Sequence, residues 1–385
     1  MPPSGDGFEV VASTPGRLDF LNTHQDYKGL PVVSVAVNLR TYAWAKRARG
    51  VCRAKSLNTG ESAEFKPGEL PSGRSFPDYV KAAVVALARA GVDVGGCELA
   101  VRGEVPIASG MASSAALLVA SVAALSRLWG GRTDPAFVAE TAYRAEREIM
   151  GIPCGRLDQY GSAFGGIAYI NTRPPYNVER LSLGEGVFVA LDSGIRHSTA
   201  DVHPKRQAEL DEGLRALAEA VPPGLKEKLR GSHSEVKWEE LAEEELAPYL
   251  AKVPRPAARR IIFTLRMHAS TLAALEVLRG RRVEAPYIDP KAYDYPDWRA
   301  RAVGAVMTYQ HSLLRDLYDV SLPELDRLVD GAIVRGAYGA KLSGAGLGGV
   351  VIALAPEEAV ERMRGMGEAR RWALRVDEGL KVEDL

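Results

Sequence analysis

The chain has 385 residues, of which 46% are hydrophobic and 25% charged, and its 49 Lys and Arg residues balance 49 Asp and Glu residues. This composition excludes a disordered protein, and the zero net charge provides no attraction to nucleic acid or to an anionic membrane. Because domains commonly hold ~100–200 residues, the length predicts two domains. We expect a globular protein that acts on a small molecule, with neither nucleic acid nor membrane as a partner.

The cysteines and the N-terminus bear on the cellular compartment. Cys52, Cys97 and Cys154 are an odd number at wide spacings without a CxxC pair, which predicts no structural zinc site and fits a reducing compartment. The first residues lack the basic start and apolar run of a signal peptide, and the longest apolar stretch, 115–125, is shorter than the ~20 residues of a membrane span. These features predict a cytoplasmic location.

The first half of the chain alternates strand-like and helical segments. β-branched or alternating residues predict four strands, over 8–12, 32–37, 97–102 and 167–170. Helices are predicted over 77–90, over the almost wholly apolar segment 112–129, and from the N-cap Asp134 to Gly151. Together these elements predict an α+β domain over residues 1–182.

The second half is mostly helical. A strand is predicted at 187–191 and another at 350–354, and charged helical segments lie between them, including 299–317 and 323–334. The segment 281–298 differs, because it concentrates Pro, Tyr and Trp residues in an irregular stretch that is too aromatic for a linker. We assign residues 183–385 to a second domain with an unusual insertion near 281–298.

A loop of small residues, Pro106 to Ala116, precedes the apolar helix. Small side chains let backbone N–H groups approach a phosphate, and a helix N-terminus adds unpaired donors and a favourable dipole. Ser113 and Ser114 would lie in the first turn, where their hydroxyls either cap the helix or contact a phosphate or its magnesium ion. By itself the loop fits a close-packed, capped turn equally well. It is not a Walker loop, because the chain contains no Gly-Lys pair.

A second glycine-rich loop spans Lys341 to Gly349 and satisfies the pattern GxGxxG at Gly344, Gly346 and Gly349. The dinucleotide-binding fingerprint requires a strand before the loop and a helix after it, whereas here a strand follows, so we reject that interpretation. The loop is either a plain glycine connection between a helix and a strand or a loop that closes over phosphate or substrate.

Two carboxylates are candidates for chemistry. At 100° per residue, Glu146 falls on the inward face of its helix together with Val138, and a buried charge needs a partner. A magnesium ion shared with a serine of the loop and a salt bridge to an Arg would each provide one. Asp158 lies in the segment 155–161, where an Asp in a loop is usually a turn residue.

The N-terminal segment 14–28 interrupts two predicted strands and is dense in hydrogen-bonding groups. It contains Arg17, Asp19, His24 and Asp26 within ten residues. Such density suits recognition of a polyol, although a polar surface loop would have the same composition.

Six motifs in a fixed order carry a resemblance to a known family. They are Pro15–Arg17 with His24 and Asp26–Tyr27; Gly110–Ala115; Asp158–Gln159 after Gly155; Ser193–Ser198; His311–Asp316 with Tyr318–Asp326; and Ser343–Gly349. In this order they resemble the GHMP kinases, named for galactokinase, homoserine kinase, mevalonate kinase and phosphomevalonate kinase. Within that family they are most similar to the galactokinase branch.

The resemblance implies an α+β fold with an N-terminal domain like ribosomal protein S5 domain 2, a ferredoxin-like C-terminal domain, and an active site between them. It implies ATP and Mg²⁺ as cofactors. Asp158 then looks like the catalytic base, Arg17 like the cation that balances the developing charge, and Ser114 and Glu146 like the magnesium ligands, with Ser113 as a substitute for Ser114. The implied ATP-binding residues are Pro106, Ser109, Gly110, Met111, Ala112, Ser113 and Ser114. The implied substrate-binding residues are Thr23, His24, Asp26, Gly155, Asp158, His203, Gly344 and Gly346.

The resemblance further implies a sugar 1-kinase that transfers the γ-phosphoryl group of ATP to an anomeric hydroxyl, as a monomer or homodimer. The chain departs from the galactokinase pattern at two positions, since Thr23 replaces a Glu that contacts the sugar and His203 replaces a Tyr. An amino sugar, an uronic acid, a pentose or a non-sugar alcohol is therefore an alternative acceptor. A catalytically inactive, sugar-sensing regulator is the alternative from another functional class.

Overall fold

The computed structural model describes residues 7–107, 109–195, 199–366 and 370–385, which form two compact units. Unit 1 consists of residues up to Leu18, Ser34–Ala168 and Val376–Leu385, and unit 2 consists of Asp19–Val33 and Tyr169–Arg375. The N-terminal segment Asp19–Val33 belongs to unit 2 because its Leu30 is fully buried in a hydrophobic core of that unit. Both units are therefore discontinuous in sequence, and the domain boundary at 182/183 remains a proposal.

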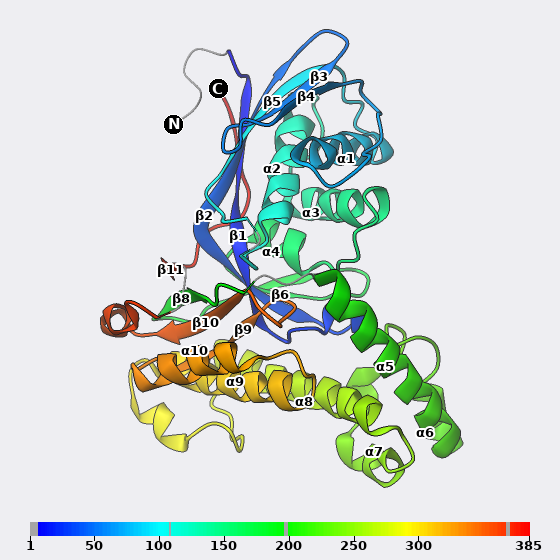
Figure 1. Cartoon of the computed structure of the whole chain (residues 1–385), viewed down its shortest axis with the longest axis vertical. Helices are drawn as coiled ribbons and strands as arrows, with labels where there is room; N and C mark the ends of the chain where they lie inside the picture. Colours follow the sequence, from blue (N-terminus) through cyan, green and yellow to red (C-terminus); the bar gives the residue numbers. More distant parts are fainter. Residues whose placement is uncertain (1–6, 108, 196–198, 367–369) are drawn as a thin grey trace. The chain divides into compact units, whose positions relative to one another are not determined.

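The larger sheet, most of whose strands belong to unit 1, brings the two ends of the described chain together. Its strand order is β12-β1-β2-β5-β3-β4, and β6 pairs with β2 and with β7. The bounds are β1 Val10–Leu21, β2 Val32–Arg47, β3 Cys52–Ser56, β4 Ser62–Phe65, β5 Cys97–Gly103, β6 Ile167–Ile170, β7 Val178–Leu181 and β12 Lys381–Asp384. Strands β3 and β5 are parallel, whereas β12 and β1 are antiparallel neighbours (Figure 1).

Four helices of unit 1 pack against one another, and Figure 1 shows them beside the sheet. They are α1 Phe76–Arg89, α2 Ser113–Leu128, α3 Pro135–Arg144 and α4 Leu157–Phe164. Most of α2 is buried, as its apolar sequence predicts. The predicted N-cap is confirmed, because the Asp134 carboxylate accepts a hydrogen bond from the Phe137 N–H at 3.1 Å. Helix α3 continues into a π-helical turn, Ala145–Ile149.

Unit 2 contains a second, antiparallel sheet in the order β11-β8-β10-β9. Its strands are β8 Val187–Asp192, β9 Gly339–Ser343, β10 Val350–Ala355 and β11 Arg371–Leu374. Its helices are α5 Thr199–Ala220, α6 Pro223–Lys228, α7 Glu243–Leu250, α8 Arg255–Leu278, α9 Trp298–Asp316, α10 Pro323–Val334 and α11 Glu357–Val360. One core joins β8, β9 and β10 to α8, α9 and α10, and a second core joins α5, α7 and α8.

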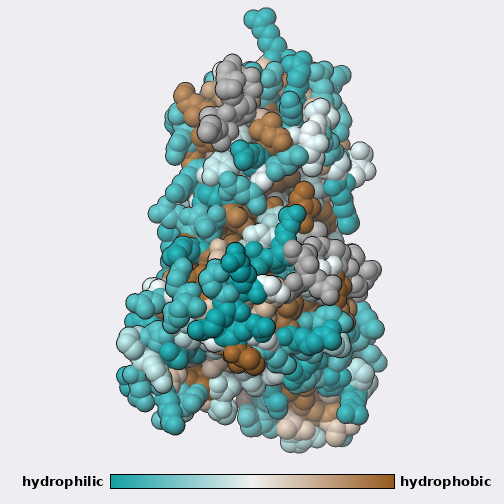
Figure 2. Space-filling view, turned by 60° about the vertical axis from the view of Figure 1, so that its left-hand side comes forward, coloured by the Kyte–Doolittle hydropathy of each residue, from teal (hydrophilic) through white to brown (hydrophobic). Residues whose placement is uncertain are grey.

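Helix α8 is long and apolar enough to cross a membrane by length and hydropathy alone. However, 67% of its most apolar window is buried inside the protein, where Phe263 and Met267 join the core of unit 2. These features are typical of a core helix. On the face shown in Figure 2, hydrophilic side chains prevail and hydrophobic ones occur in separate patches.

The structure corrects several local predictions. Strand β1 continues to Leu21, so Arg17 and Asp19 lie on a strand and not in an interrupting loop; β1 is buried on both faces and lacks the polar alternation that would have revealed it. Asp158 lies in the first turn of α4, not in a loop. The glycine-rich loop joins two strands, β9 and β10, and not a helix and a strand. The five-residue strand β9 was not predicted because it is short. The segment 281–298 is irregular apart from a 3-10 helix, Pro290–Asp294, as predicted, and its Tyr287 stacks on Tyr309 of α9 at 4.3 Å between ring centroids.

Candidate active site

Arg17 and Asp158, 141 residues apart in sequence, form an ion pair in unit 1. Strand β1 places the buried Arg17 so that its Nε and Nη2 both donate to Oδ1 of Asp158, at 2.9 and 2.5 Å. The N-terminal turn of α4 holds Asp158, and the dipole of a helix favours a negative charge there. The Asp158 side chain is 31% exposed, and its Oδ2 accepts no hydrogen bond from the described residues. One carboxylate oxygen is thus fixed while the other is open.

The loop before α2 is attached to the same arginine. Arg17 Nη1 donates to the Gly110 carbonyl at 2.7 Å, and its backbone N–H donates to the Met111 carbonyl at 3.1 Å. A Cβ atom on Gly16 would lie 2.9 Å from that Met111 oxygen, so glycine is required for the loop to approach β1. Ser109 closes the loop by donating to the Pro106 carbonyl at 2.7 Å. The Pro15–Arg17 motif therefore positions both the loop and the acid.

Glu146 faces inward, as its helical phase predicts, while Arg144, Arg147 and Glu148 are exposed. Its partners are neither an arginine nor solvent: Ser114 Oγ donates to Oε1 at 3.1 Å, and Gln159 Nε2 donates to Oε2. Burial raises the pKa of Glu146 to about 7, and the charge of Asp158 acts in the same direction. The two hydrogen bonds and the charge of Arg17 oppose this shift.

The first turn of α2 opens onto a cavity that the sequence did not indicate. Ala112, the N-cap, adopts φ 59°, and its side chain caps nothing, so the first N–H groups of α2 have no intrahelical partner. The cavity has a volume of about 380 Å³. Its wall comes from the loop, α1, α2, β2, β3, β5 and the β3–β4 turn, and it includes Thr41, Ser56, Asn58, Arg74, Tyr79, Val101, Ile107, Ser113, Ser114 and Leu117. Only Ser113 and Ser114 among these were expected to contact a ligand.

A further network supports α4 and was also missed. Glu140 of α3 accepts hydrogen bonds from Arg156 Nε and from the Tyr160 hydroxyl, both at 2.9 Å. The half-buried Gly155 directly precedes this Arg156. The network fixes α4, and hence Asp158, against α3.

In unit 2, Thr23 lies in a buried polar triad. Its hydroxyl donates to Oδ1 of Asp19 at 3.0 Å and accepts from the ammonium of Lys341 at 2.7 Å. Lys341 is fully buried and also donates to the Asp19 backbone carbonyl at 3.0 Å. Thr23 is only 1% exposed. The hydroxyl is therefore engaged within the protein, and no sequence motif indicated Lys341 as its partner.

His24 connects the N-terminal segment to the glycine-rich loop. Because a carbonyl only accepts, the Nε2–H of neutral His24 donates to the Ala345 oxygen at 3.1 Å, which leaves Nδ1 to accept from the Tyr27 hydroxyl at 3.2 Å. Tyr27 in turn accepts from the Tyr318 hydroxyl at 2.6 Å. Burial, and then the charges of His203 and Lys28, hold the pKa of His24 well below its usual range. The ring is accordingly neutral and both nitrogens are used.

The remaining predicted substrate residues lie around this chain of hydrogen bonds. The half-buried His203 ring lies 5.1 Å from the His24 ring. Asp26, two residues after His24 in the sequence, is also half-buried. Gly346 has φ 85°, and a Cβ there would lie 2.3 Å from the Val320 carbonyl, whereas Gly344 faces open space. Residues 196–198 of the Ser193–Ser198 motif lie outside the described residues.

No group of three or more His, Cys, Asp or Glu side chains that could hold a metal occurs among the described residues. Two hard oxygen ligands that contact each other in unit 1 are the Ser114 hydroxyl and the Glu146 carboxylate.

Comparisons with known proteins identify the class. The models of the GHMP kinases N terminal domain and the GHMP kinases C terminal match residues 78–166 and 299–369. The galactokinase galactose-binding signature matches residues 5–47. The crystal structure of Lactococcus lactis galactokinase complexed with galactose has a TM-score of 0.81 with 22% identity, covering 98% of this chain and 95% of that one. Mevalonate kinase of Methanococcus jannaschii has a TM-score of 0.68 with 19% identity, covering 98% and 100%.

Two curated relatives place the chain within that class. Galactokinase of Thermococcus kodakarensis is 30% identical over 345 residues, covering 89% of this chain and 88% of the relative. Human galactokinase is 31% identical over 365 residues, covering 90% and 83%. The chain belongs to the GHMP kinase family, with its α+β fold of two sheets, and it is a galactokinase-like, ATP-dependent sugar kinase. The expected family and activity are confirmed.

The raised pKa of Glu146 predicts a pH-dependent stability. Below about pH 4.5 the Glu146 carboxyl is protonated in both the folded and the unfolded state. Between about pH 4.5 and about pH 7 it ionises only in the unfolded state. The free energy of unfolding therefore decreases as the pH rises through this range. In metal-free buffer, Glu146→Gln should become more stable relative to wild type by ~3 kcal/mol from pH 4.5 to pH 8, as measured by urea unfolding.

Glu148→Gln, which removes an exposed carboxylate of the same turn, is the matched control and should follow wild type across this range. Parallel stability curves for wild type and Glu146→Gln would contradict the raised pKa.

Proposed function

We propose that this enzyme transfers the γ-phosphoryl group of ATP to the anomeric hydroxyl of a monosaccharide, with Asp158 as the base. The observation that carries the proposal is the asymmetry of the Asp158 carboxylate, whose Oδ1 is held by Arg17 while Oδ2 is open. Oδ2 accepts the proton of the acceptor hydroxyl, the hydroxyl oxygen attacks the γ-phosphorus, and the bond to the β-phosphate oxygen breaks to release ADP. Arg17 balances the charge that develops during transfer.

The donor side lies in unit 1. The cavity of about 380 Å³ is large enough for much of a nucleoside, and it extends to Ser113 and Ser114 at the start of α2. The unpaired N–H groups of that turn and the loop from Pro106 to Ala112 would bind the phosphates. The seven residues expected to bind ATP are therefore retained as the proposed phosphate site, and the cavity residues are added for the nucleoside.

A magnesium ion fits the oxygen ligands of Ser114 and Glu146, since Mg²⁺ is bound by carboxylate and hydroxyl oxygens together with substrate phosphates. When bound, it would neutralise phosphate charge. Its positive charge would also favour the ionised form of Glu146, whose pKa is otherwise raised by burial. Ser114 is preferred to Ser113 as the ligand because Ser114 is the serine that contacts Glu146.

The acceptor side is proposed to involve unit 2. Relatives named galactokinase, and the galactose-binding signature over residues 5–47, support galactose as an acceptor. The Thr23 hydroxyl, however, is already bonded to Asp19 and Lys341, and His24 uses both ring nitrogens. Thr23 and His24 would then shape the site, while the half-buried Asp26 and His203 would contact the sugar. Because Thr23 and His24 are bonded within the protein, monosaccharides other than galactose should also be tested as the physiological acceptor.

The finer assignments are also part of the proposal. They comprise the S5-like and ferredoxin-like classes of the two domains, Gly155, Gly344 and Gly346 as backbone contacts to substrate, a cytoplasmic location, and a monomer or homodimer. The open surroundings of Gly344 support a substrate contact there, whereas the glycine at 346 is already explained by its approach to Val320.

Asp158→Ala should lower kcat at least ~10²-fold, because it removes the base, while the dissociation constant of ATP measured by calorimetry changes less than about threefold. Asp93→Ala, an exposed aspartate of the same unit, is the control and should retain wild-type kinetics. Loss of ATP binding with an unchanged kcat would refute the role given to Asp158.

Ser114→Ala should raise the Mg²⁺ concentration needed for half-maximal activity by roughly tenfold, because a metal ligand is lost. Ser113→Ala keeps the pair of Ser114 and Glu146 and should leave the magnesium requirement unchanged. The opposite pattern would assign the ligand to Ser113, and an unchanged requirement in both variants would exclude this metal site.

A panel of acceptors tests the reaction itself. ADP release should be observed with monosaccharides that have a free anomeric hydroxyl, galactose included, and the product should be a sugar 1-phosphate by NMR. The matched methyl glycosides should be inert, because the attacking oxygen is blocked. Activity confined to non-sugar alcohols, or phosphorylation of methyl glycosides, would refute the assignment of the anomeric hydroxyl as the phosphoryl acceptor.

A further inference from the structure

Cys52 and Cys97 lie opposite each other at the start of two neighbouring strands in unit 1. In the parallel pairing of β3 and β5, Arg53 is opposite Glu98, and the two cysteines come one residue earlier on each strand. The N–H of Cys97 donates to the carbonyl of Val51 at 3.1 Å, which extends the ladder to this position. Both cysteines are free thiols and are 0% and 1% exposed.

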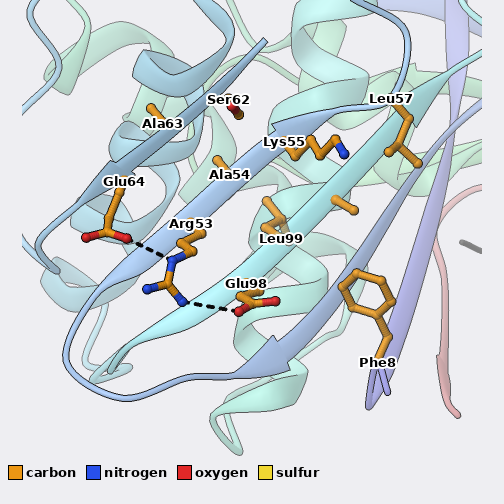
Figure 3. A pocket seen from close by; sticks show the side chains of 11 residues that line it. Phe8, Arg53, Ala54, Lys55, Leu57, Ser62, Ala63, Glu64, Glu98 and Leu99 are labelled. Carbon is orange, nitrogen blue, oxygen red and sulfur yellow. Dashed lines mark hydrogen bonds and ion pairs between the residues drawn. The ribbon is translucent and has the colours of Figure 1, made fainter. Parts of the chain in front are cut away.

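The next pair along the two strands, Arg53 and Glu98, shows that opposite side chains of β3 and β5 are in contact. Figure 3 shows Arg53 between Glu64 and Glu98 on the outer face, and the Arg53 Nη1 and Glu98 Oε1 atoms are 3.3 Å apart. Because side chains alternate along a strand, Cys52 and Cys97 project from the other, buried face. There the Cys52 thiol donates to the Gly95 carbonyl at 3.5 Å, and each of the two thiols shifts the pKa of the other, as expected for close neighbours.

The spacing suits a covalent bond. Neighbouring strands lie ~4.8 Å apart, within the Cα separations of ~4.4–6.8 Å that disulfides span without backbone movement. The neighbouring Cys97 thiol lowers the pKa of Cys52, whereas the neighbouring Cys52 thiol and burial raise the pKa of Cys97, so Cys52 ionises more readily and is the thiol that attacks an oxidant. A metal site does not fit, because no third His, Cys, Asp or Glu ligand joins the pair among the described residues.

We propose that Cys52 and Cys97 form a reversible disulfide that fastens β3 to β5. The oxidant is a disulfide of low molecular weight, such as oxidised glutathione. Exchange through a mixed disulfide joins the two Sγ atoms, the two S–H bonds break, and the oxidant's S–S bond is reduced to two thiols that take up both protons and both electrons.

The bond would fix one wall of the nucleotide cavity. Ser56 and Val101 lie further along the same two strands, on the same face as the cysteines, and both line the cavity. Strand β3 is attached to the rest of the sheet through β5, since its other neighbour is the edge strand β4. A disulfide at the start of β3 therefore restrains the hairpin β3–β4 where it joins the sheet. The third cysteine, Cys154, is outside this pair.

The test uses the folded, full-length protein incubated with oxidised glutathione. Thiol titration after denaturation should fall from three thiols to one, and peptide mapping without reduction should link the peptides of Cys52 and Cys97. The Tm should rise by roughly 5 °C over the reduced protein, because the cross-link restricts the unfolded chain. Cys154→Ser is the matched control and should still lose two thiols.

Cys52→Ser and Cys97→Ser should each retain both remaining thiols and show no oxidant-dependent change in Tm. The thiol count and the peptide map are obtained from the wild-type protein, so they stand even if one variant folds poorly. Three titratable thiols after prolonged incubation, a link that includes Cys154, or an unchanged Tm on formation of the bond would overturn the proposal.

Discussion

The Arg17 guanidinium is the interaction on which the candidate site of unit 1 depends. It joins strand β1, the loop at Gly110 and the first turn of α4, which are about 90 and 140 residues away in sequence. A lysine could not make these contacts, because only the planar guanidinium directs several donors to fixed positions. Because β1 is buried on both faces, the Arg17 side chain is surrounded by protein and is held in one orientation. The open oxygen of Asp158 is therefore oriented before any substrate binds.

Unit 2 is organised by buried cations of a different kind. Lys28 is fully buried, with its ammonium bonded to Thr264 and 4.7 Å from the rings of Phe263 and Tyr318; burial lowers its pKa well below the usual range. Lys341 is equally buried and bonds to the segment at Asp19 and Thr23. Because a buried charge is tolerated only with fixed partners, both lysines hold the N-terminal segment in one conformation. These contacts add to the burial of Leu30 in attaching the segment to unit 2.

Features that depend on neighbouring residues within one helix were predicted correctly from the sequence. The N-cap at Asp134, the buried helix α2 and the inward phase of Glu146 follow from spacing along one helix, and all are present. The resemblance to a family identified the motif residues and the activity. Contacts between distant segments could not be predicted: the extension of β1, the position of Lys341 against Thr23 and the pairing of Cys52 with Cys97 depend on strand register and packing, which no single window of sequence contains.

The pairing of β12 with β1 sets an order on folding during synthesis. Val10 lies opposite Asp384, and residues 376–385 belong to unit 1, so the sheet that carries Arg17 gains its outer strand only after the intervening chain has left the ribosome. Until then the edge of β1 has unpaired backbone groups, which are a template for association with other chains. The nascent protein therefore has to keep this edge protected while unit 2 is being translated. The residues that complete this sheet are synthesised after those of unit 2.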